Sequence, residues 1–547
     1  MEKTFLGFDL STQKLKAVQL GSKLELLHQA ELKFDDELAE EYGVSGGVCM
    51  GDCKNEYFVN PNMWVRAVDT VLDRLILDGA NFTTVVGISG SAQQHGTVYW
   101  NQQGIDTLAN LDPDQFLHNQ INGKSFAVNK SPVWMDSSTT KECEEIEAAV
   151  GGRDEMVRIT GSKAYERFSA AQIRKIFQRQ PEAYQQTARI SLVSSFLASI
   201  FLNKISPIDL SDGSGMNLLD INKRVWSQKC LDACADNLSE KLGVPVPTAS
   251  VLGSIGHFFV QRYQFTPTCK VVAFTGDNCS ALSGLNIDDD CLAFSLGTSD
   301  TIMMSLDSHP SLEQGHVLIH PIKEDKFMGL LCFKNGSLVR DTFKKAEAND
   351  SWEIFSELLE LAPRGNNGFM ALHYLSQEIL PNVSAATLRW TPLDTYEYNK
   401  QRVEMIQFPT QQYEIRALIE GQMLNRKAFA MDMGFNFGAN TKIIATGGSS
   451  SNKSILKVMA DVFNCPVYIK KTPEAACLGA AYRANYVVYR EDAKKAGDKI
   501  ENFNDYIKNL STDSHRIAEP YGDSHDIYIP MLNRYREMAQ VMLENQN

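Results

Sequence analysis

The chain has 547 residues, 43% of them hydrophobic and 22% charged, the composition of an ordinary folded protein that is too long for one hydrophobic core. A net charge of −14 without long basic runs excludes nucleic acid and anionic membranes as the main partners. Eleven scattered cysteines, a start unlike a signal peptide and no apolar run long enough to span a bilayer predict a cytoplasmic protein with free thiols.

Short apolar strands that end in polar or glycine turns recur along the chain. The first two, over residues 5–10 and 15–20, enclose a turn at Ser11–Lys14, and a third is expected over 24–32. Later apolar segments run abruptly into turns, and they cover residues 84–90 before SAQQHG, 270–275 before GDN and 441–446 before GGSSSN. Each of these turns is a candidate ligand-binding loop.

Helical periodicity fills the chain between these strands. We expect helices over 62–77, 139–150 and 413–431, a buried helix over 190–202 and a closing helix over 531–544. Strands that alternate with helices predict an α/β fold with its ligands at the strand ends. We expect an N-terminal domain over 1–285, a C-terminal domain over 286–489 and a polar tail over 490–547.

The first hairpin has a counterpart in the second half of the chain. Residues 7–20 (GFDLSTQKLKAVQL) and 293–306 (AFSLGTSDTIMMSL) match without a gap, so that Phe8 aligns with Phe294 and Thr12 with Thr298. Both segments place a polar turn between two apolar strands. This arrangement indicates two related halves.

The two hairpin turns are candidate phosphate sites. Small polar residues in a tight turn can aim several backbone N–H groups at one anion, and the hydroxyls of Thr12 and Thr298 could add donors. Asp9, at the end of the first strand, could hold Mg²⁺ directly or through water. Taken alone, each turn is better explained as an ordinary tight hairpin with turn-favouring residues, and it is the presence of two similar turns that favours a phosphate site.

Three further strand ends carry candidate chemistry. Asp277, in the tripeptide GDN, could be a general base that accepts a proton from a hydroxyl, although a turn aspartate is the commoner role for such a residue. His95 in QQHG could bind a ligand or be a structural histidine. Gly447 and Gly448 could let a nucleoside lie against the backbone or could simply end a strand.

No motif for a competing mechanism is present in the sequence. We find no G-x-x-x-x-G-K-[ST] loop, no G-x-S-x-G elbow, no H-E-x-x-H and no G-x-G-x-x-G after the first strand. Phosphorylation of a hydroxyl needs none of these, because it requires only phosphate cradles, Mg²⁺ and an orienting base.

Ten segments in order resemble the FGGY family of carbohydrate kinases, and within it the eukaryotic kinases of D-xylulose. The resemblance extends from Gly7 to about Ala484. Its carriers are GFDLSTQKLKAV, SGSAQQHG, SPVWMDSST, GSKAYERF, SPIDLSDGSGMNLL, VVAFTGDN, SLGTSDT, LLCFKNGSL, RALIEGQ and ATGGSSSN.

The resemblance implies two actin-like ATPase (ribonuclease H-like) domains of α/β class, with sugar and ATP in the cleft between them. It implies ATP-dependent phosphorylation of D-xylulose at its C5 hydroxyl, with Asp277 as the base and Asp9 as a second catalytic carboxylate. Asp9 and Asp277 would hold Mg²⁺. The sugar would contact His95, Arg167, Asp277 and Asn278, and ATP would contact Thr12, Gly297, Thr298, Trp352, Gly447, Gly448 and Ser451.

Some segments depart from the family pattern. Ser11 stands where many relatives have glycine, WMDSS with Asp136 replaces the bacterial WNDGR, and residues 364–402 lack the bacterial hairpin motif. The open alternatives are a kinase of another polyol, such as ribulose, glycerol or gluconate, and an actin- or chaperone-like ATP-binding protein. We expect a monomer or homodimer with no nucleic-acid or membrane partner.

Overall fold

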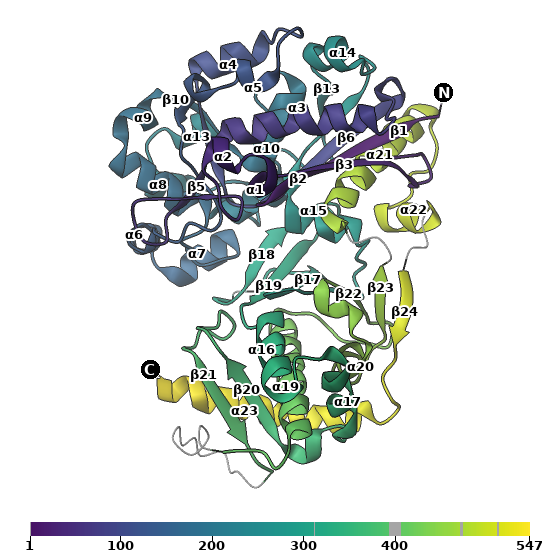
Figure 1. Cartoon of the computed structure of the whole chain (residues 1–547). Coiled ribbons are helices and arrows are strands. Elements are labelled where there is room, and N and C mark those ends of the chain that lie inside the picture. The colour runs from purple at the N-terminus through teal and green to yellow at the C-terminus, as the bar shows by residue number, and fades with distance from the viewer. Residues whose placement is uncertain (1, 311, 393–405, 471–473, 511–513, 547) are drawn as a thin grey trace. The chain divides into compact units, whose positions relative to one another are not determined.

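The computed structural model describes residues 2–310, 312–392, 406–470, 474–510 and 514–546. The chain forms two compact units, which Figure 1 shows as ribbons. Unit 1 comprises Met1–Asn286, Ser311–Met328 and Glu474–Thr512, and unit 2 comprises Ile287–Pro310, Gly329–Pro473 and Asp513–Asn547. Part of the segment 364–402 discussed above, residues 393–402, lies outside the described residues.

Unit 1 is built on a mixed sheet whose strands follow the order β13-β14-β6-β1-β2-β3, with the short β15 also paired to β6. Strands β1 and β2 form an antiparallel hairpin, whereas β6 lies parallel to β1 on its other side. The bounds are β1 Thr4–Leu10, β2 Lys14–Leu20, β3 Leu26–Lys33, β6 Val85–Ala92, β13 Val251–Ser254, β14 Lys270–Val272 and β15 Thr275–Gly276.

Apolar helices cover this sheet and exclude water from its centre. Helix α10 is buried along its whole length, as its continuous apolar sequence VSSFLASIFL predicts. One large core contains Phe8, Trp64, Phe196 and Phe201. The helices that pack here are α3 Pro61–Leu77, α10 Val193–Leu202, α15 Asp277–Gly284 and α21 Ala475–Ala496.

The predicted helix over 190–202 was wrong at its start. Residues up to Leu192 belong to strand β10 (Thr187–Leu192), which pairs with β7 (Thr97–Asn101), and the helix begins only at Val193. The predicted strand over 270–275 is also interrupted, because β14 ends at Val272 and β15 begins at Thr275. Periodicity could not separate these elements, because the residues on both sides of each boundary are buried.

The strands of unit 2 belong to a second mixed sheet, in which they follow the order β19-β17-β16-β22-β23-β24. Strands β16 and β17 form an antiparallel hairpin, and β22 is parallel to β16. The bounds are β16 Cys291–Leu296, β17 Asp300–Leu306, β19 Phe327–Phe333, β22 Lys442–Thr446, β23 Val467–Lys470, β24 Ser514–Ala518, α16 Ser337–Glu347, α17 Trp352–Leu361, α19 Gln411–Asp432, α20 Lys453–Phe463 and α23 Ser524–Gln546.

The two sheets share a hairpin and a neighbouring parallel strand, as the internal match indicated. The turns differ in length, however. Leu10 pairs with Leu15, which leaves four residues between them, whereas Leu296 pairs with Asp300, which leaves three. The gapless alignment therefore holds for the first strand of each hairpin but slips by one residue on the second.

The chain returns to unit 1 after unit 2. Helix α21 packs against β1, β6 and α15, so residues 474–512 belong to unit 1 although they follow unit 2 in the chain. In the part of the chain that the structure describes, no helix combines the length and hydrophobicity needed to cross a membrane.

Candidate active site

Asp277 is the first residue of helix α15 and directly follows β15, which pairs with the last residues of β6. Its Oδ1 accepts hydrogen bonds from the backbone N–H of Asn278 at 2.8 Å and from Asn278 Nδ2 at 3.2 Å. Burial raises the pKa of Asp277 to about 7, and the charge of Asp9 adds to this effect. A carboxyl group with this pKa can both accept and hold a proton near neutral pH.

Asp9 is the penultimate residue of strand β1 and lies between two neighbouring strands. It pairs with Lys16 on β2 and with Ser91 on β6, and the Ser91 hydroxyl donates to Asp9 Oδ1 at 2.6 Å. Burial raises the pKa of Asp9 to about 6, although the Ser91 bond opposes the rise. Burial disfavours the ionised form of both Asp9 and Asp277. A bound cation would therefore favour ionisation of the two carboxyl groups.

His95 follows β6 in a left-handed backbone conformation, with φ of 71°, that is rare outside glycine. Its Nδ1 lies 2.9 Å from the carbonyl oxygen of Gly215, which only accepts, so Nδ1 carries the hydrogen and Nε2 has a free lone pair. Burial lowers the pKa of His95 to about 4, and the positive charge of Arg167 adds to this effect. The ring is therefore neutral at physiological pH.

His316 joins this group and was not predicted from the sequence. Its ring centroid lies 5.0 Å from that of Phe168, which also stacks on the His95 ring at 4.2 Å. The Nδ1 atom of His316 is 3.1 Å from the Ser162 hydroxyl. Burial, followed by the charge of His95, lowers the pKa of His316 to about 3. No local motif surrounds His316, so only the folded chain reveals it.

Trp134 connects the first hairpin turn to Arg167, and sequence reasoning also missed it. Its indole N–H donates to the Thr12 hydroxyl at 2.8 Å, and the Arg167 guanidinium lies 5.4 Å from its ring centroid. The signal was available, because Trp134 stands in the segment SPVWMDSST.

Asp136, in the same segment, has a different environment. It is buried and bound by Lys175 at 3.0 Å, by Gln172 at 2.9 Å and by Ser138. Burial opposes its ionisation, but the bonds from Ser138 and the charge of Lys175 outweigh burial and lower its pKa. These partners make Asp136 a structural residue that holds its own loop.

The second hairpin turn, Gly297–Ser299, exposes the side chain of Thr298. The Ser337 backbone N–H donates to the Gly297 carbonyl at 2.9 Å, which ties the turn to the start of α16. Directly after the turn, buried Asp300 receives bonds from Arg340 at 2.6 Å and Arg426 at 3.1 Å. The turn is therefore fixed to the start of α16 through Gly297, while the side chain of Thr298 remains exposed.

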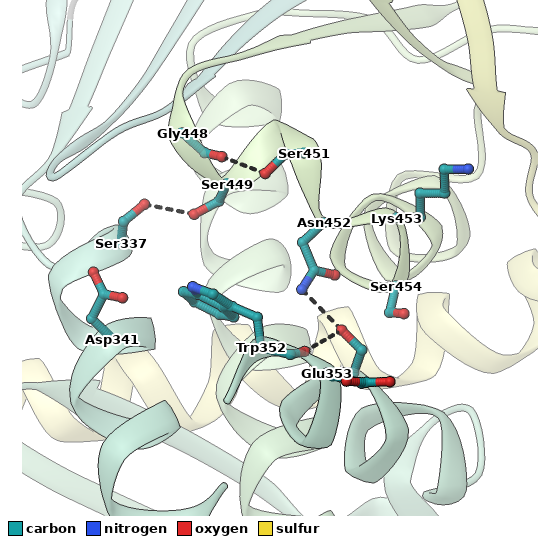
Figure 2. A pocket seen from close by; sticks show the side chains of 11 residues that line it. Ser337, Asp341, Trp352, Glu353, Gly448, Ser449, Ser451, Asn452, Lys453 and Ser454 are labelled. Carbon is teal, nitrogen blue, oxygen red and sulfur yellow. Dashed lines mark hydrogen bonds between the residues drawn. The ribbon is translucent and has the colours of Figure 1, made fainter. Parts of the chain in front are cut away.

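A cavity of about 580 Å³ in unit 2 contains three of the predicted nucleotide residues, Trp352, Gly448 and Ser451. Figure 2 shows the Trp352 indole projecting into it between Asp341 and Asn452. The complete lining is Ser337, Asp341, Trp352, Glu353, Ser356, Gly448, Ser449, Ser451, Asn452, Lys453 and Ser454. Asp341 was not predicted, since nothing in its local sequence marks it.

Hydrogen bonds hold the wall of this cavity. The hydroxyls of Ser337 and Ser449 are 2.8 Å apart (Figure 2). Asn452 Nδ2 donates to the Ser356 hydroxyl at 3.0 Å. Gly447 lies just outside the lining, with φ of 83°, and a Cβ there would lie 2.8 Å from the carbonyl carbon of Leu296. Only glycine lets this turn approach the end of β16.

The fold thus divides the predicted residues between two places. Asp9, Thr12, His95, Arg167, Asp277 and Asn278 lie in unit 1, whereas Gly297, Thr298, Trp352, Gly447, Gly448 and Ser451 lie in unit 2. Among the described residues, no group of three or more His, Cys, Asp or Glu side chains surrounds a metal position. Asp9 and Asp277 suit Mg²⁺, which uses few carboxylates together with waters and phosphates.

Comparisons with known proteins find similarity over most of the chain. Residues 124–284 match the N-terminal domain model of the FGGY family of carbohydrate kinases, and residues 292–488 match its C-terminal domain model. The chain is 44% identical to a xylulose kinase from Rattus norvegicus over 98% of this chain and 97% of the rat protein.

Solved structures share the fold at low sequence identity. The crystal structure of a ligand-bound xylulose kinase from Lactobacillus acidophilus has a TM-score of 0.78 at 18% identity, covering 100% of this chain and 99% of that one. A gluconate kinase from the same organism reaches a TM-score of 0.77, also at 18% identity, covering 99% and 98%. This fold therefore occurs with more than one sugar substrate.

Proposed function

The chain belongs to the FGGY family of carbohydrate kinases, and we propose that it transfers the γ-phosphoryl group of ATP to the C5 hydroxyl of D-xylulose. We assign the sugar to unit 1 and ATP to unit 2. The observation that carries this proposal is Asp277, a carboxyl group with a pKa of about 7 at a strand end beside Asn278.

Asp277 acts as the general base. As the C5 oxygen attacks the γ-phosphorus, Asp277 accepts the hydroxyl proton, the bond from phosphorus to the bridging oxygen breaks, and ADP leaves. The two bonds from Asn278 hold Asp277 Oδ1 in place, so the carboxylate needs no rearrangement to receive the proton.

The neighbouring side chains bind and orient the sugar. Neutral His95 offers its Nε2 lone pair to a sugar hydroxyl, because Nδ1 already donates to Gly215. Arg167, supported by the face of Trp134, supplies cationic donors for sugar oxygens. A site that matches hydroxyl groups with fixed donors and acceptors can discriminate strongly between sugars.

The adenine and ribose of ATP occupy the cavity of unit 2, and the adenine stacks on Trp352. Thr298 and the backbone of Gly297 contact the phosphates, and Thr12 supplies a further hydroxyl. Asp9 and Asp277 would hold Mg²⁺, which neutralises charge on the phosphoryl oxygens when bound. Two carboxylates whose burial disfavours isolated negative charge fit such a cation.

The choice of D-xylulose is supported by the xylulose kinase from rat, which is 44% identical over nearly the whole chain. The fold alone does not support it over other polyols, since the gluconate kinase of Lactobacillus acidophilus has a similar TM-score. Phosphorylation of ribulose, glycerol or gluconate is the alternative within the family.

A coupled ADP-release assay across D-xylulose, D-ribulose, gluconate and glycerol tests the proposal, with Asp277→Asn as the inactive control. We expect kcat/KM for D-xylulose to exceed the others by at least ~100-fold. A higher kcat/KM for another sugar of the panel would identify that sugar as the substrate. Inactivity towards the whole panel would refute the kinase assignment.

A further inference from the structure

The side chain of Gln94 connects Asn278 to a fully buried carboxyl group. Gln94 Oε1 accepts a hydrogen bond from Asn278 Nδ2 at 2.9 Å, and Gln94 Nε2 lies 3.5 Å from Asp212 Oδ1 and 3.9 Å from the Cys279 sulfur. Gln94 and Asp212 are 3% and 1% exposed. Neither side chain therefore depends on solvent for its orientation.

Asp212 sets the direction of this chain of bonds. Its Oδ2 accepts a hydrogen bond from the Ser194 hydroxyl at 2.5 Å, which leaves Oδ1 as the acceptor for Gln94 Nε2 at 3.5 Å. Gln94 must then present its NH₂ group to Asp212 and its carbonyl oxygen to Asn278. Reversing the Gln94 amide would place two oxygens together at one end and two NH₂ groups together at the other.

Packing confines Gln94 to this position. A Cβ atom on Gly276 would lie 2.5 Å from Gln94 Cγ and 2.7 Å from Asp212 Oδ1. Glycine at 276 therefore leaves the space that the Gln94 side chain occupies beneath the base. The same residue precedes Asp277, so the backbone that positions the base also confines the glutamine.

The direction of the bonds is passed on to Asn278. Its Nδ2 hydrogens are used by Gln94 Oε1 at 2.9 Å and by Asp277 Oδ1 at 3.2 Å. Within the described part of the chain, Asn278 Oδ1 makes no hydrogen bond, and the side chain is only partly buried. The carboxamide is thus turned with its acceptor outward.

We infer that Gln94, held by Asp212, is a positioning residue that makes Asn278 a hydrogen-bond acceptor for a sugar hydroxyl. Asn278 then accepts from the sugar through Oδ1 while its Nδ2 donates to the base. The inference rests on the proposed function only in assigning the sugar to this site. It adds that buried Asp212, acting through Gln94, determines that Asn278 accepts a hydrogen bond from the sugar and does not donate one.

The test is a double-mutant cycle in the full-length protein, read by calorimetric titration of D-xylulose without ATP. Gln94→Met removes the amide at similar volume, and Asn278→Ala removes the proposed acceptor. We expect Gln94→Met to raise the Kd of D-xylulose about 10-fold in the wild-type background and less than 2-fold in the Asn278→Ala background. Gln19→Met, which removes another buried amide, is the matched control and should leave this Kd unchanged.

Two further readouts separate positioning from general damage. The KM for ATP and the melting temperature should stay near their wild-type values in Gln94→Met, while the sugar constant changes. An equal rise in Kd in both backgrounds, or none in either, would overturn the inference, and so would a wild-type protein that binds no D-xylulose. Tight sugar binding without turnover would refute the proposed function and leave the inference standing.

Discussion

Replacing Asp277 by asparagine separates the proton acceptor from the geometry that holds it. An asparagine oxygen at this position can still accept the bonds from the Asn278 N–H and Nδ2, which measure 2.8 and 3.2 Å in the native protein. The variant loses the ability to take a proton and also the negative charge that would help to hold Mg²⁺. General base catalysis contributes about 10²–10⁴-fold, so we expect kcat to fall at least ~100-fold with little change in the KM for sugar.

We expect Asp277→Asn, which lowers activity, to raise the stability of the fold. Burial raises the pKa of Asp277 from 3.8 to about 7 in the folded chain, so the folded state binds its proton more tightly than the unfolded state does. The aspartate therefore destabilises the fold as pH rises from about 4 to 7, by at most about 4 kcal/mol above pH 7. Asp277→Asn removes this penalty, since it carries no charge.

Thermal unfolding at pH 8 and pH 4.5, in EDTA to exclude divalent cations, measures the difference. We expect Asp277→Asn to melt at a higher temperature than the wild type at pH 8 and at nearly the same temperature at pH 4.5. A variant that is inactive but equally or less stable at pH 8 would contradict the raised pKa. Near-normal turnover would remove Asp277 from the mechanism.

Three other perturbations test separate parts of the site. Trp352→Ala should raise the KM for ATP about 10-fold, because base stacking on an aromatic ring contributes about 1–3 kcal/mol, and should leave the KM for sugar unchanged. An equal rise in both constants would argue against an adenine site. Arg483→Met should lower the free energy of unfolding by about 3 kcal/mol in urea titrations, since buried Arg483 donates hydrogen bonds to the Ser89 hydroxyl and the Gly90 carbonyl and its charge opposes the rise that burial causes in the pKa of Asp209. An unchanged midpoint would show that these contacts contribute nothing to stability. EDTA should abolish turnover, and adding Mg²⁺ should restore it. The melting temperature should stay within a few degrees of the untreated protein, because no cluster of the described side chains encloses a metal. A large loss of stability would reveal a structural metal.

Local signals in the sequence predicted those parts of the site that a short segment determines. The hairpin turns, the GDN tripeptide and the Gly447 turn each follow a strand directly, so strand-end position was enough to select them. Trp134 was within reach of the same reasoning, because it stands in a segment that carried the family resemblance.

Contacts between distant segments could not be predicted in this way. His316 lies 154 residues beyond its partner Ser162, and Asp212 lies 118 residues beyond Gln94. The boundaries of the two units follow the same principle, because α21 packs against β1 after the whole of unit 2 has intervened. Periodicity and turn chemistry describe neighbours along the chain and carry no information about such pairs.

The unequal lengths of the two hairpin turns have a consequence for protein engineering. Side chains alternate between the faces of a strand, so an alignment that is wrong by one residue reverses the face assigned to every residue that follows. The residue paired with Asp9 is Lys16, whereas the residue paired with Ser295 is Thr301. A gapless alignment therefore assigns the residues of the second strand to the wrong face, whereas exchanging the whole turns between the paired residues would keep each strand on its native face.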